Sequence, residues 1–285
     1  MGSGLEAYLA RAADIPAVLG EIGRLREVSF RAVGEGTGNS RDLDIFDEHY
    51  LHLFLWNPAT REIAGAYRLT STRDAVARYG VAGLYTATLF EFDENFLARL
   101  GPALELGRSF VRAEYQRSFA PLLLLWKAIG VHVARHPEEK TLFGPVSISA
   151  RYRLESRSLM VRWLEEWASW PDLGRLVRER NPFRRGSGAE AAAGDVEQLS
   201  RVVSGMEPDG AGVPVLLRQY LKLGGRLLGF NVDPAFSGVV DGLIVVDLTR
   251  TEPRWLSRYL GIEEAARFLQ HHRGAHGKIE VITHA

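Results

Sequence analysis

A predicted β-hairpin places the strongest constraint on how this chain can fold. Residues 50–56 and 63–69 are both rich in apolar residues, and residues 57–60, with the sequence Asn-Pro-Ala-Thr, lie between them. Two strand-like runs separated by a few turn residues predict an antiparallel pair of strands. The sheet that contains this pair therefore cannot be purely parallel.

The rest of the sequence supplies more strands and several helices. Strands are predicted at residues 6–12, 83–92, 103–111, 141–149, 227–232 and 238–248. Helices are predicted at residues 16–30, 120–134, 155–167, 172–179, 214–224 and 263–271. Strands with helices scattered between them indicate an α/β fold with a mixed sheet.

The composition excludes several classes of protein. The chain has 285 residues, 46% of them hydrophobic and 25% charged, which is typical of a globular protein with one large domain or two small ones. Lysine plus arginine and aspartate plus glutamate number 35 each, so the charge balance gives no reason to expect nucleic-acid binding. The sequence contains no cysteine, which excludes disulfides, thiolate metal ligands and a cysteine nucleophile.

The N-terminus and the apolar runs favour a cytoplasmic location. The first residues lack the basic and apolar segments of a signal peptide. The longest apolar run, residues 121–126, is far shorter than the roughly 20 residues that cross a bilayer. We therefore expect a cytoplasmic protein and leave open a peripheral contact with the inner face of the membrane.

Several common catalytic signatures are missing. There is no Gly-x-Ser-x-Gly elbow and no Walker-type phosphate loop, and no histidine precedes an aspartate by five residues, as it does in glycerolipid acyltransferases. His49 and His52 are predicted on one strand, where their odd spacing sends them to opposite faces. They cannot share a metal ion, and we expect no metal site.

A dispersed set of polar and aromatic residues remains as the candidate site. Its members are Arg26, Phe30, Asp44, Asp47, Arg68, Glu105 and Arg108. Several of the charged members lie inside or at the ends of apolar strand patterns, where a buried charge is costly unless it is paired. The set therefore indicates either an active site or a structural network of ion pairs.

The spacing of these residues resembles a known family. The order Arg…Phe, Asp-x-x-Asp, Gly-x-x-Arg-Leu and Glu-x-x-Arg is similar to that of acyl-homoserine-lactone synthases, which are GNAT-fold enzymes that take acyl groups from acyl carrier protein. Longer blocks resemble hemolysin-like, ornithine-lipid-synthase-type N-acyltransferases; they are residues 30–38, 41–47, 105–111, 142–149, 214–222 and 229–234. Where the homoserine-lactone enzymes carry a tryptophan, this chain has the glycine-rich residues 34–38, which argues against homoserine-lactone synthesis.

The resemblance implies both a fold and an activity. It implies a GNAT-like, mostly antiparallel central sheet flanked by helices over residues 5–250, with a helical insertion at about 155–200, a flexible linker at 184–194, and a C-terminal helix and tail at 251–285. It also implies an N-acyltransferase that moves a long acyl chain, with a 3-hydroxyl group as one option, from acyl carrier protein to the amine of an amino acid. The product would be a lyso-aminolipid such as lyso-ornithine lipid.

The candidate residues have predicted roles in this chemistry, and Arg26 and Phe30 are expected to belong to the substrate-binding set. Glu105 is the candidate catalytic base, acting through a water. Asp44 and Asp47 are expected to attract the ammonium group of the acceptor, and Arg68 to bind its carboxylate as a bidentate fork. Arg108 lies three residues after Glu105, so a regular strand would turn it to the opposite face, toward a neighbouring carboxylate.

The sequence favours acyl carrier protein over coenzyme A as the donor, with no tightly bound cofactor. Coenzyme-A-dependent GNAT enzymes bind the pyrophosphate on a glycine loop at a helix N-terminus, where this chain has the bulky Phe119. A basic stretch is the candidate docking site for the acidic carrier. Its members are Arg175, Arg178, Arg180, Arg184 and Arg185. The alternative is that these arginines form a solvated helix face.

Two other functions are compatible with the same sequence. One is a coenzyme-A-dependent O-acyltransferase that acts on a lysolipid or a polyol. The other is a non-catalytic module that binds acyl carrier protein or a lipid surface. For the N-acyltransferase, ornithine, lysine, glycine, glutamine and serine all suit a site made of aspartate and arginine.

Overall fold

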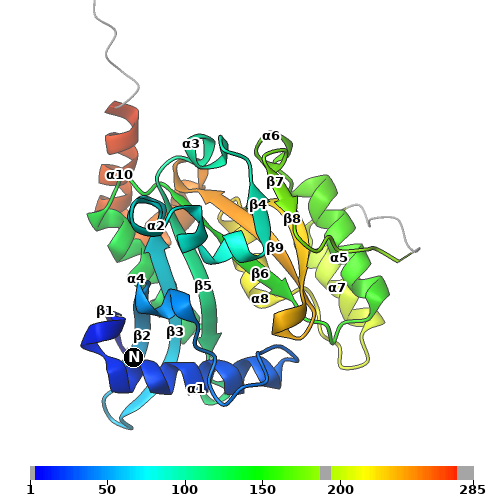
Figure 1. The fold of residues 1–285 in the computed structure, drawn as a ribbon, viewed down its shortest axis with the longest axis horizontal. Helices are drawn as coiled ribbons and strands as arrows, with labels where there is room; N and C mark the ends of the chain where they lie inside the picture. Colours follow the sequence, from blue (N-terminus) through cyan, green and yellow to red (C-terminus); the bar gives the residue numbers. More distant parts are fainter. Residues whose placement is uncertain (1–3, 187–193, 275–285) are drawn as a thin grey trace, which may run out of the picture.

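The computed structural model describes residues 4–186 and 194–274, which build one seven-stranded sheet with helices on both faces (Figure 1). The strands run in the order β1 (Glu6–Arg11), β2 (Leu51–Asn57), β3 (Glu62–Ser71), β5 (Ala103–Val111), β6 (Thr141–Ile148), β9 (Val239–Asp247) and β8 (Arg226–Asp233). All neighbours are antiparallel except β5 and β6, which are parallel. The predicted mixed, mostly antiparallel sheet is confirmed.

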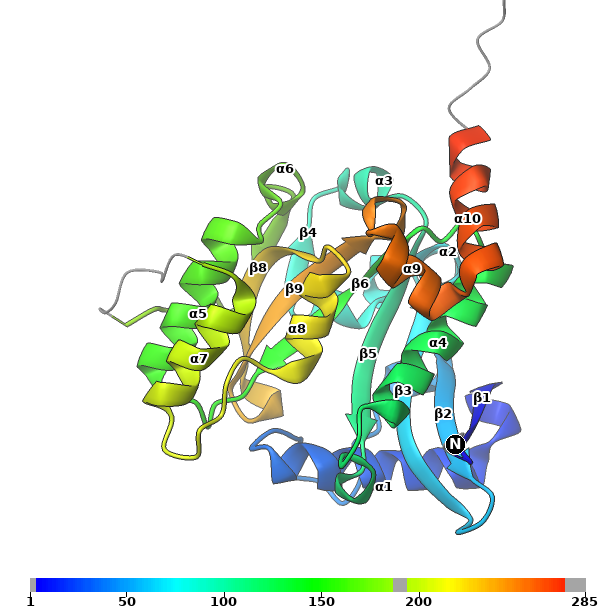
Figure 2. The same ribbon diagram turned by 180° about the vertical axis from the view of Figure 1, so that it is seen from behind.

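Most of the helices cover one face of the sheet (Figure 2). They are α4 (Ala120–Arg135), α5 (Leu154–Trp167), α7 (Val196–Met206), α8 (Val215–Lys222), α9 (Pro253–Leu260) and α10 (Ile262–Gly274). Their apolar side chains form a large cluster with alternate residues of the strands, such as Leu104 and Leu106 of β5. Burial of these alternate positions fixes which face of each strand points to this core.

The opposite face of the sheet is covered by α1 (Pro16–Ala32) at one end and by residues 84–100 at the other (Figure 1). The second of these segments includes α3 (Phe96–Leu100) and β4 (Phe90–Phe92), which follow α2 (Thr72–Tyr79) in the chain. Two separate hydrophobic clusters form here. One packs α1 against β2, β3 and β5, and the other packs residues 84–100 against β5, β6 and β9.

The parallel strands β5 and β6 separate after a short contact (Figure 1). They pair only from Ala103 with Thr141 to Glu105 with Phe143, although both strands continue beyond these residues. Gly144 lies where they part, and a Cβ there would collide with the carbonyl oxygen of Leu106. Beyond this point the facing backbone groups of the two strands do not bond to each other.

A bulge in β5 changes the direction of one predicted site residue. Arg108 has a φ of 51°, and the register of β5 against β3 shifts at this place. The extra residue reverses the alternation, so Phe110 packs on the α1 side although Leu106 packs on the other. The prediction that Arg108 faces away from Glu105 is therefore wrong, because the bulge puts both on one face.

Two predicted elements have a different structure. Residues 83–92 are predicted as one strand, but they form 3-10 turns and the short β4, because the N–H groups of Tyr85 and Thr86 are engaged by a buried side chain and not by a neighbouring strand. Residues 172–179 are predicted as a helix, but they form the short α6 (Pro171–Gly174) and β7 (Val177–Glu179), which pairs with β4.

The region predicted as a helical insertion contains α5, α6, β7 and α7. Residues 187–193 of the predicted linker and residues 275–285 of the predicted tail lie outside the described part of the chain. The helices α2 and α9 were not predicted from the sequence. Within residues 4–186 and 194–274, no helix has the length and apolar character that crossing a membrane requires.

The point where β5 and β6 part should be intolerant of any side chain. We expect Gly144→Ala to lower the free energy of unfolding by about 1–3 kcal/mol, because the new methyl group would force two backbones apart. Gly107→Ala is the control, since a Cβ at Gly107 meets no atom within 4 Å. Thermal and urea unfolding of both variants provide the measurement, and equal stability of the two would contradict this account of the parting strands.

Candidate functional site

A band of charged side chains runs between the two hydrophobic clusters on the α1 side of the sheet. Its members come from α1, from residues 42–47, and from β3, β5, β8 and β9, and we call them the polar band. They are Arg26, Asp42, Asp44, Asp47, Arg68, Glu105, Arg108, Asp233 and Asp241. Most of these residues are buried, so their pairing decides whether the fold tolerates them.

Asp47 holds two buried arginines together. Its Oδ1 lies 2.7 Å from Nη1 of Arg26, and its Oδ2 lies 3.2 Å from Nη1 of Arg68. Burial raises the pKa of Asp47, but the two guanidinium charges outweigh burial and bring the pKa to about 2. Asp47 is only 3% exposed, and both of its carboxylate oxygens are occupied by the ion pairs. Its predicted contact with the acceptor stays a prediction.

Arg68 is completely buried in an aromatic cage. Its guanidinium carbon lies 5.1 Å and 4.9 Å from the ring centres of Tyr50 and Tyr85, and its Nη1 lies 2.6 Å from Oδ1 of Asp44. Among the described residues, its Nε and Nη2 have no hydrogen-bond partner. A substrate carboxylate cannot reach Arg68 in this arrangement, because the surrounding side chains leave its guanidinium no exposed surface. The predicted carboxylate fork at Arg68 therefore does not fit the structure.

Glu105 is buried and fully engaged. Its Oε1 accepts the N–H of Thr86 at 2.7 Å, and its Oε2 accepts the N–H of Tyr85 at 3.2 Å and the hydroxyl of Tyr50. Burial raises the pKa of Glu105, as a base requires. The carboxylate is nevertheless closed off from solvent. Its hydrogen bonds stabilise the turn at residues 85–88, and its catalytic role stays a prediction.

Arg108 and Asp44 are the members of the polar band whose side chains are partly exposed. The side chain of Arg108 is 11% exposed and that of Asp44 is 26% exposed, and their Nη2 and Oδ2 atoms lie 3.8 Å apart. Nε of Arg108 lies 2.9 Å from Oδ2 of Asp42, and its Nη1 donates to the hydroxyl of Tyr85 at 3.0 Å. Two of its three nitrogen atoms are thus held at short distance, while Nη2 has only the longer contact with Asp44.

Phe30 belongs to the wall of this site. It is buried on α1 and makes an edge-to-face contact with Phe236, with ring centres 5.1 Å apart. The guanidinium of Arg108 lies 4.6 Å from the centre of the same Phe236 ring. The structure therefore brings Phe30 to the site that its spacing predicted, as a packing residue behind Arg108.

The sequence missed several members of the site. Asp42 lies two residues before Asp44 in the same acidic segment and pairs with Arg108, so the segment itself carried a signal. Tyr50 and Tyr85 fit the pattern of ordinary strand residues, and nothing in that pattern marks them as partners of an arginine. Asp233 and Asp241 belong to distant strands, and no spacing in the sequence connects them to Arg108.

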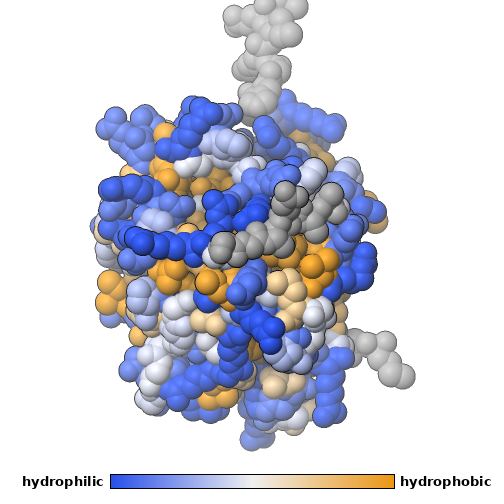
Figure 3. Space-filling model, turned by 90° about the vertical axis from the view of Figure 1, so that its right-hand side faces the viewer, coloured by the Kyte–Doolittle hydropathy of each residue, from blue (hydrophilic) through white to orange (hydrophobic). Residues whose placement is uncertain are grey.

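The five arginines of the predicted docking site do not form one helix face. Arg178 and Arg180 both pair with Glu91 of β4, and Arg185 pairs with Glu165 of α5. All five side chains are exposed or partly exposed, but these acidic partners offset part of their charge. The side of the molecule with α5 and α7 shows mainly hydrophilic side chains with scattered hydrophobic ones (Figure 3).

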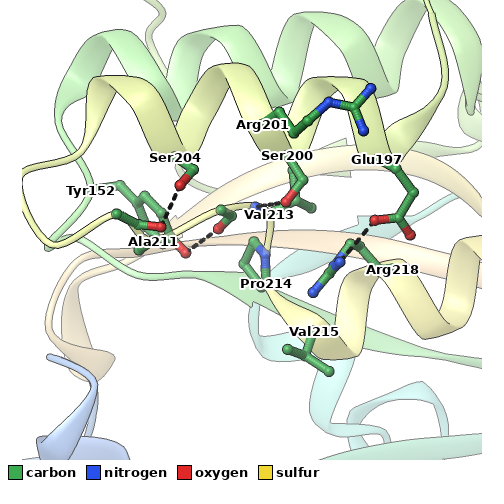
Figure 4. Close-up of a pocket in the computed structure, with 12 residues that line it drawn as sticks. Tyr152, Glu197, Ser200, Arg201, Ser204, Ala211, Val213, Pro214, Val215 and Arg218 are labelled. Carbon is green, nitrogen blue, oxygen red and sulfur yellow. Dashed lines mark hydrogen bonds and ion pairs between the residues drawn. The ribbon is translucent and has the colours of Figure 1, made fainter.

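An open pocket of about 580 Å³ lies between α7, α8 and residues 210–215 (Figure 4). The hydroxyl of Tyr152 donates to the carbonyl of Gly212 at 2.6 Å, and Arg218 pairs with Glu197 at 2.9 Å. None of the residues predicted as the site lines this pocket. In the described part of the chain, no three histidine, aspartate or glutamate side chains converge as metal ligands do.

Comparison with known proteins finds acyltransferases among the proteins that this chain resembles. Residues 25–127 match the acetyltransferase (GNAT) domain family, which supports the predicted GNAT-like fold for that part of the chain. A glycine N(alpha)-acyltransferase of Bacteroides thetaiotaomicron is 38% identical over 62% of this chain and 56% of that protein. An L-ornithine N(alpha)-acyltransferase of Brucella abortus is 29% identical over 94% of this chain and 100% of that protein.

The coverage of these relatives differs. The chain spans little more than half the length of the glycine acyltransferases that it matches. Among solved structures, FeeM, an N-acyl amino acid synthase from uncultured soil microbes, aligns with a TM-score of 0.47 at 10% identity, over 91% of this chain and 97% of that one.

The pairing of Asp47 with two arginines predicts a pH-dependent stability. We expect Asp47→Asn to cost about 3–5 kcal/mol at pH 7, because it leaves two buried arginines without their shared counter-charge. The folded-state pKa of about 2 lies below the ordinary 3.8, so the stabilisation is complete above about pH 4 and is lost as the pH falls toward 2. The difference between variant and parent in urea unfolding should therefore shrink at pH 3.

Asp74→Asn is the matched control, since the side chain of Asp74 is 73% exposed and pairs with its neighbour Arg73. We expect that substitution to change stability by less than about 1 kcal/mol. A parent-like melting temperature for Asp47→Asn at pH 7 would show that the ion pairs do not hold the site together.

Proposed function

We propose that this GNAT-fold chain is an N-acyltransferase that moves a long acyl chain from a thioester carrier to the amine of an amino acid. The observation that carries the proposal is the parting of β5 and β6 beside the partly exposed Arg108 and Asp44. Relatives named as glycine and L-ornithine N(alpha)-acyltransferases support an amino acid as the acceptor.

The gap between the parted strands suits the donor. The backbone N–H and C=O groups of β5 and β6 that face each other beyond Glu105 and Phe143 are not used by a strand ladder. An extended arm with amide groups can pair with such edges as an added strand does. An N–H group at the same place can stabilise the oxyanion that forms when an amine attacks the thioester carbonyl.

The two partly exposed charges suit the acceptor. Arg108 can bind a carboxylate through Nη2, and Asp44 can bind an ammonium group. The buried members then support these two residues, since Asp42 fixes Arg108 and Arg68 fixes Asp44 at 2.6 Å. In this proposal Glu105 is a positioning residue, since it holds the turn that carries Tyr85 against Arg108.

Acyl carrier protein is the proposed donor. Phe119 is 37% exposed and directly precedes α4, at the helix start where a glycine loop would have to let a pyrophosphate approach. The arm of acyl carrier protein carries a single phosphodiester, which needs less space at the start of α4 than a pyrophosphate does. The exposed arginines between residues 175 and 185 would steer an acidic carrier protein. The proposed product is a lyso-aminolipid.

The donor is tested by comparing matched acyl-carrier protein and acyl-coenzyme A with a panel of glycine, ornithine, lysine, glutamine and serine. We expect kcat/KM to be at least about tenfold higher for the carrier and to fall with added salt, because the Debye length is only about 8 Å at physiological ionic strength. Mass spectrometry of the products separates the alternatives. Equal values for both donors would contradict the carrier proposal, and an O-acylated product alone would contradict the N-acyltransferase.

The acceptor site is tested with two aspartates of the same segment. Asp44→Asn should raise the KM of the amino acid by about tenfold, the order of one lost charge-assisted contact, and leave the KM of the carrier nearly unchanged. It should also lower stability, because Arg68 then keeps only the charge of Asp47. Asp47→Asn should lower stability more, because its carboxylate is committed to two buried arginines. If Asp44→Asn raises the carrier KM and not the acceptor KM, Asp44 belongs to the donor site.

A further inference from the structure

Two carboxylates of the site, Asp241 and Glu35, make no direct ion pair with another described residue. Asp241 of β9 lies opposite Ser147 of β6, and its Oδ1 accepts the hydroxyl of Ser147 at 2.7 Å. Its other oxygen accepts no hydrogen bond from a described residue. Neither Asp241 nor Glu35 forms an ion pair within the described part of the chain. A buried carboxylate without an ion pair is costly in free energy, so two of them at the edge of a site can bind a cationic group or a proton.

Asp241 faces the same space as Arg108. Side chains alternate along β6, so Ser147 shares the face of Phe143, which pairs with Glu105. This is the face that the bulge gives to Arg108. Asp241 is only 2% exposed, and it lies beyond the point where β5 and β6 part.

The glycine-rich residues 34–38 bring Glu35 to this place. Gly34 has a φ of 78° and ends α1, and the N–H of Glu35 donates to the carbonyl of Phe30 at 2.9 Å, as in a Schellman cap. Ser149 donates to the carbonyl of Val33, and Ser237 donates to the carbonyl of Gly36. The backbone on both sides of Glu35 is thus fixed to the residue that follows β6 and to the turn between β8 and β9.

The surroundings of Glu35 and Asp241 raise the pKa of both carboxyls toward neutral pH. Burial raises the pKa of Glu35 to about 7, the charge of Asp241 adds to this, and Arg108 opposes it. Burial likewise raises the pKa of Asp241 to about 7, although Ser147 lowers it. The charges of Asp233, Tyr85 and Tyr152 also act on the two carboxylates. Arg151 packs against Gly34, next to Glu35 in the chain, and donates to the carbonyl of Ala32.

We propose that Glu35 is the catalytic residue that takes a proton from the ammonium group of the acceptor. Asp241, held by Ser147, is the positioning residue, because its negative charge beside Glu35 helps the Glu35 carboxylate to accept that proton. This inference rests on the proposed N-acyltransferase function. Glu35 is the partly exposed member of the pair. Its neighbour Gly36 is bonded to Ser237, which follows the Phe236 ring that packs on Arg108, the residue that binds the acceptor carboxylate in that function. In this proposal the role of the glycine-rich residues 34–38 is to place Glu35 at the site.

The proton balance of the step is simple. The ammonium group of the acceptor gives one proton to the carboxylate of Glu35 and becomes a neutral amine. The nitrogen then bonds to the thioester carbonyl carbon, and the carbon–sulfur bond breaks. The nitrogen loses a second proton, which neutralises the leaving thiolate, and the proton on Glu35 returns to solvent.

Glu35 suits this step better than Glu105. Three donors hold the charged form of Glu105 in place, and its carboxylate is closed off from solvent. Glu35 is reached from the surface and has no such donors among the described residues. A pKa near 7 is also the value at which a base accepts a proton most effectively at neutral pH.

The test is the pH dependence of kcat with acyl-carrier protein and the best acceptor of the panel. Glu35→Gln should lower kcat by about 10²–10⁴-fold with an intact fold, and the residual rate should rise with pH as the free amine accumulates. Asp241→Asn removes a negative charge from beside Glu35, so the acidic limb of the profile should move to lower pH. Asp247→Asn, on the same strand but capping Thr249, is the matched control and should leave both quantities unchanged.

A direct titration completes the test. The carboxyl carbon resonance of Glu35 in 13C NMR should titrate near pH 7 in the parent and at lower pH in Asp241→Asn. Ser147→Ala provides a second, milder variant if Asp241→Asn does not fold. Without the hydroxyl the pKa of Asp241 rises and less negative charge remains beside Glu35, so the acidic limb of the profile should again move to lower pH, by a smaller amount. If the parent forms no N-acyl product, the proposed function fails. If the parent is active and Glu35→Gln is as active, the role of Glu35 alone is refuted.

Discussion

The pairing of buried arginines with a short acidic segment is the interaction on which the site depends. Arg26, Arg68 and Arg108 come from a helix and two strands, and the acidic segment at residues 42–47 gives each of them a carboxylate. Without those partners, three charges would lie between two hydrophobic clusters at a large cost in free energy. The segment therefore joins α1 to the sheet and fixes the side chains at the surface of the site.

Two local departures from regular β-structure turn this network into a site. The bulge at Arg108 moves its guanidinium to the face of Glu105 and of Asp241. The parting of β5 and β6 leaves backbone groups unused beside that guanidinium. A regular strand and a fully paired sheet would have buried the same residues without any place for a donor or an acceptor, so the irregular geometry creates the opportunity for chemistry.

Much of the fold follows from local patterns, and the wrong predictions have a common cause. The hairpin, most of the sheet and the helices α1, α4 and α5 were predicted because their hydrophobic periodicity is strong. The predictions for residues 83–92 and 172–179 were wrong, since tertiary contacts decide their structure. The N–H groups of Tyr85 and Thr86 bind Glu105, a residue that lies about twenty positions later in the chain.

The sequence by itself determined the type of fold and the set of arginines and acids that had to be paired, because both follow from composition and spacing. It could not decide which of them stay buried and which reach the surface. The tertiary structure made that division: it closed Arg68 and Glu105 into the core and left Arg108 and Asp44 at the surface. It also brought Glu35 and Asp241, two hundred positions apart, to the same space, because a helix cap and a strand pairing meet there and no local pattern encodes their meeting.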